Sequence, residues 1–118
     1  MTIARLLPLD VHGALEVLVA LVIMVAPFML GFEPAAMIAS VLLGSLVLGV
    51  ALATHVGDEG ALPISAHAAF DIAFAIAMSA GAVVFAIVED VPAAAFMAVG
   101  AVSLILISSL TRYSPNRA

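Results

Sequence analysis

Two histidine–carboxylate pairs are the residues of this sequence that could do chemistry. His12 is followed four positions later by Glu16, and His67 is followed four positions later by Asp71. Residues four apart lie on one helical face, so each imidazole lies beside its carboxylate. Together the two pairs could ligate a divalent metal such as zinc or iron, or pass protons, because histidine titrates near neutral pH. The third interpretation is structural, with both pairs at the membrane interface among lipid headgroups.

The composition places these pairs in a membrane protein. Of the 118 residues, 66% are hydrophobic and 9% are charged, whereas a soluble domain is about half apolar and about a quarter charged. A small soluble domain could not hide so much apolar surface from water. The chain has no cysteine, which excludes disulfides, and its formal net charge of −5 argues against a nucleic-acid partner. We expect no cofactor.

Four apolar segments are long enough to cross the hydrocarbon core of a bilayer, which takes roughly 20 helical residues. Proline, glycine and acidic residues separate them. The alternation that marks a membrane barrel is missing from the sequence, and helices satisfy their own backbone in lipid. We therefore predict an all-α membrane protein, a four-transmembrane-helix bundle in a single domain over residues 1–118. The predicted spans are residues 12–32, 35–54, 64–88 and 92–110.

The positions of the arginines predict the orientation. Arg5 precedes the first span, and Arg112 and Arg117 follow the fourth. An even number of spans puts both termini on one side, and positively charged flanks mark the cytoplasmic side. We expect a multi-pass protein of the cell membrane with both termini in the cytoplasm. The loop at Asp58 and Glu59 would then also face the cytoplasm.

The sequence contains two tandem copies of a two-helix unit. A shift of 55 residues overlays the first span on the third and matches both histidine–carboxylate pairs. A shift of 58 residues overlays the second span on the fourth and matches Pro34 with Pro92. Repeat 1 covers about residues 12–54 and repeat 2 about residues 67–111. Tandem two-span units share one orientation, so a pseudo-twofold axis along the membrane normal would place the two pairs equivalently.

One stretch of the first repeat carries a family resemblance. The sequence reads His12-Gly-Ala-Leu-Glu16 and later Ala26-Pro27-Phe28-Met-Leu-Gly31-Phe32. It resembles the SPW-repeat family of small bacterial integral membrane proteins, whose repeat has a Ser-Pro-Trp-like motif late in its first helix, often before Gly-Phe. Ala26 and Phe28 stand where Ser and Trp are usual, and the second repeat has Gly81, Ala82 and Val83 there. The resemblance covers nearly the whole chain and implies two tandem two-helix repeats without an established activity.

Two further features concern helix shape and packing. Pro27 removes a backbone hydrogen bond and is predicted to kink the first span near its outer end. Small residues recur at helical spacing and allow close approach of helices in lipid. We interpret them as packing faces within the chain, with a homo-oligomer interface as the alternative. They are Ser45, Gly49 and Ala53 on the second span, and Ala69, Ala73, Ala77 and Gly81 on the third.

The sequence favours a structural or interaction component of the membrane over an enzyme. It has no glycine-rich phosphate loop, and Ser65 lies too near His67 along one helix for a catalytic triad. The expected partners are membrane lipids, a second copy of the chain or another membrane protein. One alternative is an ion- or proton-conducting or transport protein that uses the two histidine–carboxylate pairs. The other is a membrane metal-binding protein with the same four ligands, His12, Glu16, His67 and Asp71.

Overall fold

Four helices make up the described part of the chain. The computed structural model describes residues 8–55 and 64–111, and the helices in them are α1 (Leu9–Leu30), α2 (Pro34–His55), α3 (Ile64–Ile87) and α4 (Val91–Leu110). All four are long and apolar enough to cross a membrane. The prediction of an all-α, four-helix membrane protein is confirmed. The largest difference from the predicted spans is at α1, which begins at Leu9 rather than at residue 12.

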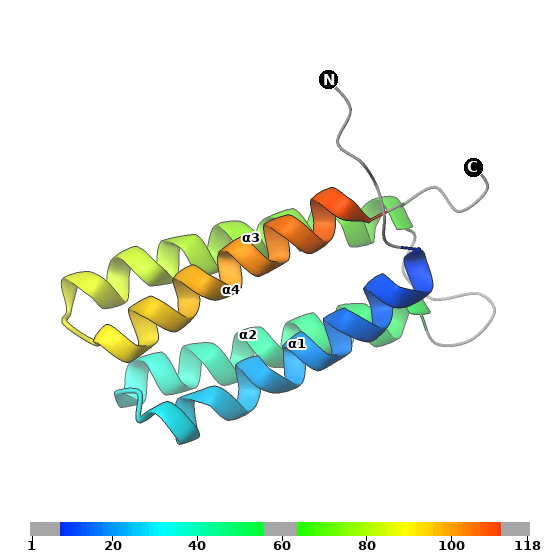
Figure 1. The fold of residues 1–118 in the computed structure, drawn as a ribbon. Helices are drawn as coiled ribbons and strands as arrows, with labels where there is room; N and C mark the ends of the chain where they lie inside the picture. The colour runs from blue at the N-terminus through cyan, green and yellow to red at the C-terminus, as the bar shows by residue number, and fades with distance from the viewer. Residues whose placement is uncertain (1–7, 56–63, 112–118) are drawn as a thin grey trace.

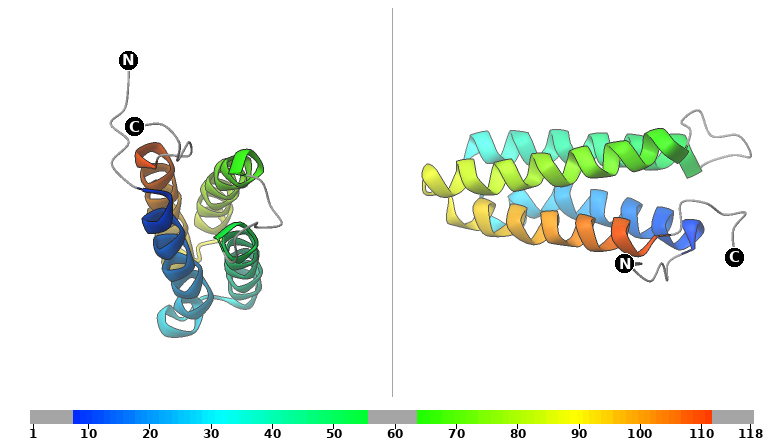
Figure 2. Two further views of the ribbon diagram at one scale, coloured as in Figure 1. Left: turned by 90° about the vertical axis from the view of Figure 1, so that its right-hand side faces the viewer. Right: turned by 90° about the horizontal axis from the view of Figure 1, so that it is seen from above.

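The helices form two antiparallel hairpins, α1–α2 and α3–α4 (Figure 1). Packing is extensive within each hairpin, and the hairpins meet each other over fewer residues, along α1–α4 and α2–α3. Viewed end-on, the hairpins lie side by side in one bundle (Figure 2). The starts of α1 and α3 and the ends of α2 and α4 therefore share one end of the bundle, here termed the proximal end. The two hairpin turns form the distal end.

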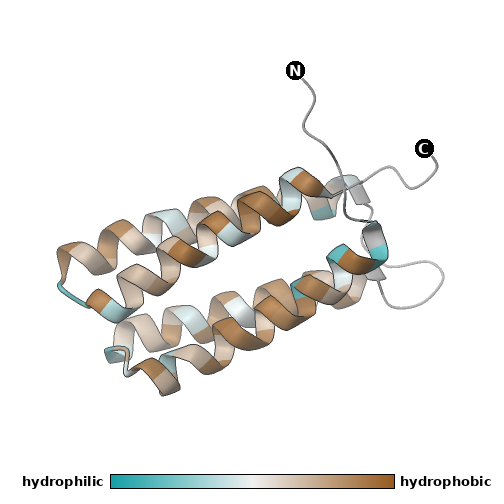
Figure 3. Ribbon diagram, in the orientation of Figure 1, coloured by the Kyte–Doolittle hydropathy of each residue, from teal (hydrophilic) through white to brown (hydrophobic). Residues whose placement is uncertain are grey.

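Apolar side chains cover the outside of the bundle as well as its inside. Met29 is 79% exposed and Ile87 is 74% exposed, and hydrophobic residues run along all four helices (Figure 3). An exposed apolar surface of this extent needs lipid around it. The chain is thus a small multi-pass membrane protein. Its arginines and the loop at residues 58–59 lie outside the described residues, so the cytoplasmic position of both termini stays a prediction.

The core of the bundle is built from apolar side chains that range in size from alanine to phenylalanine. Gly100 allows α4 to approach α3, because a Cβ atom there would overlap the side chain of Met78. The Ser40 hydroxyl donates to the Ile23 carbonyl at 2.6 Å and joins α2 to α1. The buried cluster consists of Ala20, Ile23, Val47, Phe74, Ala75, Met78, Met97, Ala101 and Leu104.

Polar and aromatic contacts join the two hairpins at the distal end. The Asp90 carboxylate accepts the Glu33 backbone N–H at 2.8 Å and also caps the first turn of α4. Beside it, the rings of Phe32 and Phe96 lie with their centroids 5.7 Å apart. Asp90 is 4% exposed, so its backbone partners satisfy a carboxylate that is largely out of solvent.

The structure corrects part of the packing prediction. Ala69, Ala73 and Ala77 are exposed, and a Cβ atom on Gly49 would meet nothing within 4 Å. The three alanines do not pack helices within the chain, because the polar and bulky side chains of α3 take up its inner face. Gly49 is exposed on α2 and does not pack against another helix either. Of the remaining predicted packing residues, Ala53 is half-buried, Ser45 contacts the Met24 sulfur and Gly81 faces Met97.

Pro27 is buried inside α1, which continues to Leu30 before Gly31 ends it in the left-handed conformation with φ of 69°. Glycine adopts this conformation at little cost, which suits a helix C-terminus. The Pro27 carbonyl accepts the Phe32 backbone N–H at 3.0 Å. The helix therefore passes through the proline, and the predicted kink stays a prediction.

Candidate metal centre

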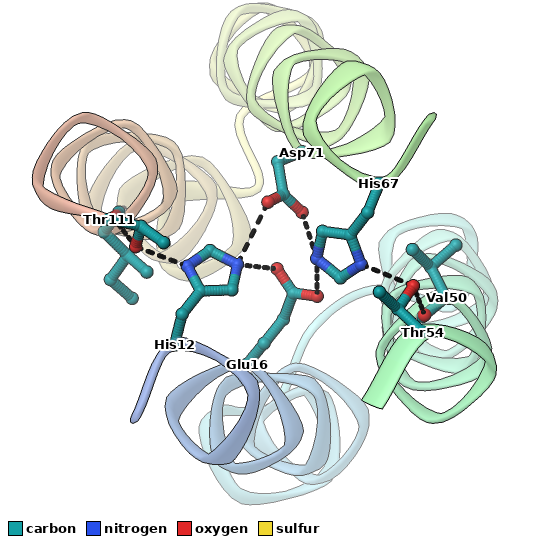
Figure 4. Close-up of polar contacts among 8 residues, drawn as sticks. His12, Glu16, Val50, Thr54, His67, Asp71 and Thr111 are labelled. Carbon is teal, nitrogen blue, oxygen red and sulfur yellow. Dashed lines mark hydrogen bonds and ion pairs between the residues drawn. The ribbon is translucent and has the colours of Figure 1, made fainter. Parts of the chain in front are cut away.

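The two predicted pairs converge inside the bundle near its proximal end. His12 and Glu16 come from α1, and His67 and Asp71 come from α3. All four are at most 1% exposed, and their side chains point toward one another (Figure 4). The interpretation that places these pairs among lipid headgroups is therefore wrong. The helical faces that carry them point inward, where each charged group gains a partner in the bundle interior.

The four side chains form a closed ring, here termed the His–carboxylate ring. His12 Nε2 lies 3.3 Å from Glu16 Oε2 and 3.1 Å from Asp71 Oδ2. His67 Nε2 lies 2.9 Å from Glu16 Oε1 and 3.3 Å from Asp71 Oδ1. The contacts between α1 and α3 are thus shorter than the contacts within each helix. Each carboxylate bridges both imidazoles, and each Nε2 atom lies between two carboxylate oxygens.

Two threonines contact the outer sides of the imidazoles. Nδ1 of His12 lies 2.6 Å from Thr111 Oγ1, and Nδ1 of His67 lies 2.7 Å from Thr54 Oγ1. Each threonine hydroxyl donates its proton to the backbone carbonyl four positions earlier (Figure 4). A hydroxyl has a single proton, so its oxygen must accept the hydrogen bond from Nδ1–H. Both Nδ1 atoms therefore carry a proton, and Nε2 is the atom that each imidazole presents to the ring.

Thr54 and Thr111 hold corresponding positions near the proximal ends of α2 and α4, although the sequence analysis missed them. Thr54 from α2 contacts the histidine of α3, and Thr111 at the end of α4 contacts the histidine of α1. They are 57 positions apart (111 − 54), one less than the shift of 58 that aligns α2 with α4. The repeat alignment therefore did not pair them. The sequence feature that could have identified them is their position. Each is a hydroxyl residue at the end of the second or fourth span, and the histidines lie near the starts of the first and third spans at the same end of the bundle.

The charges of the ring limit what it can hold. Glu16 and Asp71 supply two negative charges when ionised, and residues 8–55 and 64–111 contain no lysine or arginine. Buried carboxylates without a counter-charge are strongly destabilising. Two protons, one on each Nε2, would balance these charges, as would one divalent cation bound by both Nε2 lone pairs. The ring is therefore suited to two protons or to one divalent cation.

The donor atoms and their spacing fit a metal ion. One ligand atom from each of the four residues can be chosen so that all four lie within 4.8 Å of one another. A tetrahedral zinc ion, bound at about 2.0–2.2 Å, has ligand atoms about 3.3–3.6 Å apart. The nitrogen–oxygen separations around the ring are 2.9–3.3 Å and involve both oxygens of each carboxylate, so the ring would widen slightly to hold an ion through one oxygen of each. The threonines supply the outer hydrogen bond that metal-ligating histidines need to hold their tautomer and orientation.

Comparisons with protein-family models, with curated proteins and with solved structures found no match to this chain. Fold and site together define a small multi-pass helical membrane protein with a buried His–carboxylate ring. The resemblance to the SPW-repeat family stays a prediction.

Proposed function

We propose that this chain is a membrane metal-binding protein that holds one divalent transition-metal cation, with zinc as the best match to its ligands. His12 and His67 would bind through Nε2, and Glu16 and Asp71 through one oxygen each. The observation that carries this proposal is the orientation of the imidazoles. Both Nε2 atoms face the two carboxylates, and both Nδ1 protons are directed to threonine oxygens. Imidazole nitrogen with carboxylate oxygen is a ligand set that suits zinc and iron.

A purely structural role explains the ring less well. Buried ion pairs contribute little net stability, and apolar residues of similar volume often replace them without loss. The hairpins already pack through the apolar core and through the distal contacts of Asp90. Four ionisable residues at this position are therefore better explained by a ligand than by the stability of the fold.

Proton conduction through the bundle is also less well supported. A conducting path needs polar groups that continue beyond the ring toward the distal end. Between the ring and the distal end, the buried residues that the structure describes are apolar, among them Ala20, Phe74 and Met78, except for Ser40. The Ser40 hydroxyl donates to the Ile23 carbonyl, so it is already paired with the backbone. The geometry favours binding at one level of the membrane over passage across it.

Binding in the ring would also join the two repeats. Each hairpin supplies one imidazole and one carboxylate, so a bound cation connects α1 to α3. With the termini in the cytoplasm of a cell-membrane protein, the ring would lie near the cytoplasmic face and take its cation from that side. A second copy or another membrane protein could pack against the exposed small residues of α3, such as Ala73 and Ala77.

Zinc titration of the purified protein in detergent micelles tests this function. We expect one zinc ion per chain after gentle purification. Glu16→Gln and His67→Gln should lower the affinity by more than the 10–100-fold loss that is typical of an outer-shell change. Asp10→Asn is the matched control, because Asp10 is an exposed carboxylate on the same helix. A folded protein without stoichiometric zinc, or unchanged affinity in Glu16→Gln, would contradict the proposal.

A further inference from the structure

A groove lies on the lipid-facing side of the second hairpin, between α3 and α4, with a volume of about 360 Å³. Its floor contains the buried residues Ala75 and Leu104. Its rim contains isoleucines that are at least half exposed, among them Ile76 at 64% and Ile105 at 50%. Because these residues belong to membrane-spanning helices, the groove opens toward the hydrocarbon of the bilayer and not toward water.

A difference between the two repeats explains why the groove is open. Ser79 corresponds to Met24 under the shift of 55 residues. The Met24 side chain lies between α1 and α2, where its sulfur is 3.5 Å from the Ser45 hydroxyl. Gly44 makes room for it, because a Cβ atom there would lie 2.6 Å from Met24 Cγ. Ser79 is short and donates to the Ala75 carbonyl at 2.8 Å, so it leaves the corresponding space of the second hairpin unfilled.

The polarity of the groove matches the orientation of a lipid in one leaflet. Asp71, Ser108 and Ser109 line its proximal end, and the lining toward Ser79 is mostly apolar. Asp71 and Ser79 are eight residues apart, a rise of about 12 Å along the helix. That distance is most of one leaflet, since the hydrocarbon core is about 30 Å thick. The groove thus runs from a polar end near the membrane surface toward the middle of the bilayer.

We propose that the groove binds one acyl chain of a phospholipid, with the head group at the proximal end beside Ser108 and Ser109. An unfilled groove in hydrocarbon would lose the dispersion contacts of its lining, and lipid chains are the apolar molecules that surround this face. Asp71 lines both the groove and the His–carboxylate ring. The bound chain therefore covers the lipid-facing side of the ring. This inference does not depend on a metal in the ring.

Native mass spectrometry can count the phospholipids that stay bound after extraction from vesicles of phosphatidylethanolamine and phosphatidylglycerol. We expect one retained phospholipid per chain for the native protein. Ser79→Ala keeps the groove open and should retain it, whereas Ser79→Met should fill the groove and retain none. Met24→Ser should open the matching space in the first hairpin and retain a second phospholipid.

Helical circular dichroism identifies any variant that does not fold. If Ser79→Met does not fold, Met24→Ser tests the inference alone. A second retained phospholipid supports the inference, and no gain contradicts it. Equal retention by the native protein and folded Ser79→Met would overturn the inference. So would a broad distribution of bound lipids without a defined number, because that is the behaviour of ordinary annular contact.

Discussion

His12 and His67 lie edge to face inside the bundle, with ring centroids 5.4 Å apart and ring planes inclined at 69°. They come from different hairpins, yet both Nε2 atoms face the same two carboxylates. The ring thus depends on both hairpins, because each hairpin supplies one imidazole and one carboxylate. Its stability and its metal affinity should therefore depend on the complete set and not on any one member.

Removal of one member should cost more than removal of the whole ring. Glu16→Gln leaves an unbalanced buried charge, and we expect it to lower the free energy of unfolding by about 3–5 kcal/mol. The fourfold variant His12→Leu, Glu16→Met, His67→Leu, Asp71→Leu removes every charge and should cost less than Glu16→Gln alone. Denaturant titration in mixed micelles measures both values without added metal. A fourfold variant less stable than the single variant would contradict this account of the ring.

The threonines should affect the zinc affinity through the histidine tautomer. Thr54→Val and Thr111→Val keep the shape of the side chain and remove the acceptor of the Nδ1 proton. Each should lower the zinc affinity by about 10–100-fold. Thr54→Ser and Thr111→Ser keep the hydroxyl and should bind zinc as the native protein does. Equal affinity in the valine and serine variants would show that the threonines only fill space.

Much of the fold followed from the sequence because lipid imposes simple requirements. A bilayer fixes the length of an apolar helix, and proline, glycine and acidic residues such as Glu33 and Asp90 mark the turns. The spacing of the histidine–carboxylate pairs correctly placed each pair on one helical face. The tandem repeat itself stays a prediction.

The direction of those faces could not be predicted, because every face of these helices is apolar enough to meet lipid. Helix rotation is decided by packing, such as the close approach of Gly100 to Met78. The roles of Thr54 and Thr111 could not be predicted either. Each contacts a histidine on another helix, and such a contact produces no characteristic residue spacing in the sequence. The small residues of α3 also form a regular stripe, and only the packed structure shows that Ala69, Ala73 and Ala77 face outward.

Removal of the metal should lower the thermal stability of the protein. Free zinc at 100 times its Kd stabilises a folded protein that binds it by about 2.7 kcal/mol, provided that the unfolded chain does not bind. We expect a chelator to lower the Tm in micelles and zinc to restore it. The fourfold ring variant is the control and should show no response to zinc. An equal response in that variant would place the zinc outside the ring.

Substitution by alanine should have different effects on the free energy of unfolding at two glycines of α2. A Cβ atom on Gly44 would lie 2.9 Å from the Ala20 carbonyl oxygen, whereas a Cβ atom on Gly49 meets nothing within 4 Å. Gly44→Ala should therefore force α1 and α2 apart and cost about 1–3 kcal/mol. Gly49→Ala should be neutral or stabilising by up to about 1 kcal/mol, because alanine is the better helix former. Unfolding in mixed micelles compares them, and a similar loss in both would contradict the packing of this hairpin.

Cobalt(II) absorption spectroscopy tests the metal centre most directly, because cobalt(II) replaces zinc and its visible bands report the coordination geometry. We predict one cobalt ion per chain with the intense visible bands of four-coordinate cobalt. These bands should be lost in Glu16→Gln and kept in Asp10→Asn. Weak bands typical of six-coordinate cobalt, or no stoichiometric cobalt in a folded protein, would contradict the claim that His12, Glu16, His67 and Asp71 form a metal site.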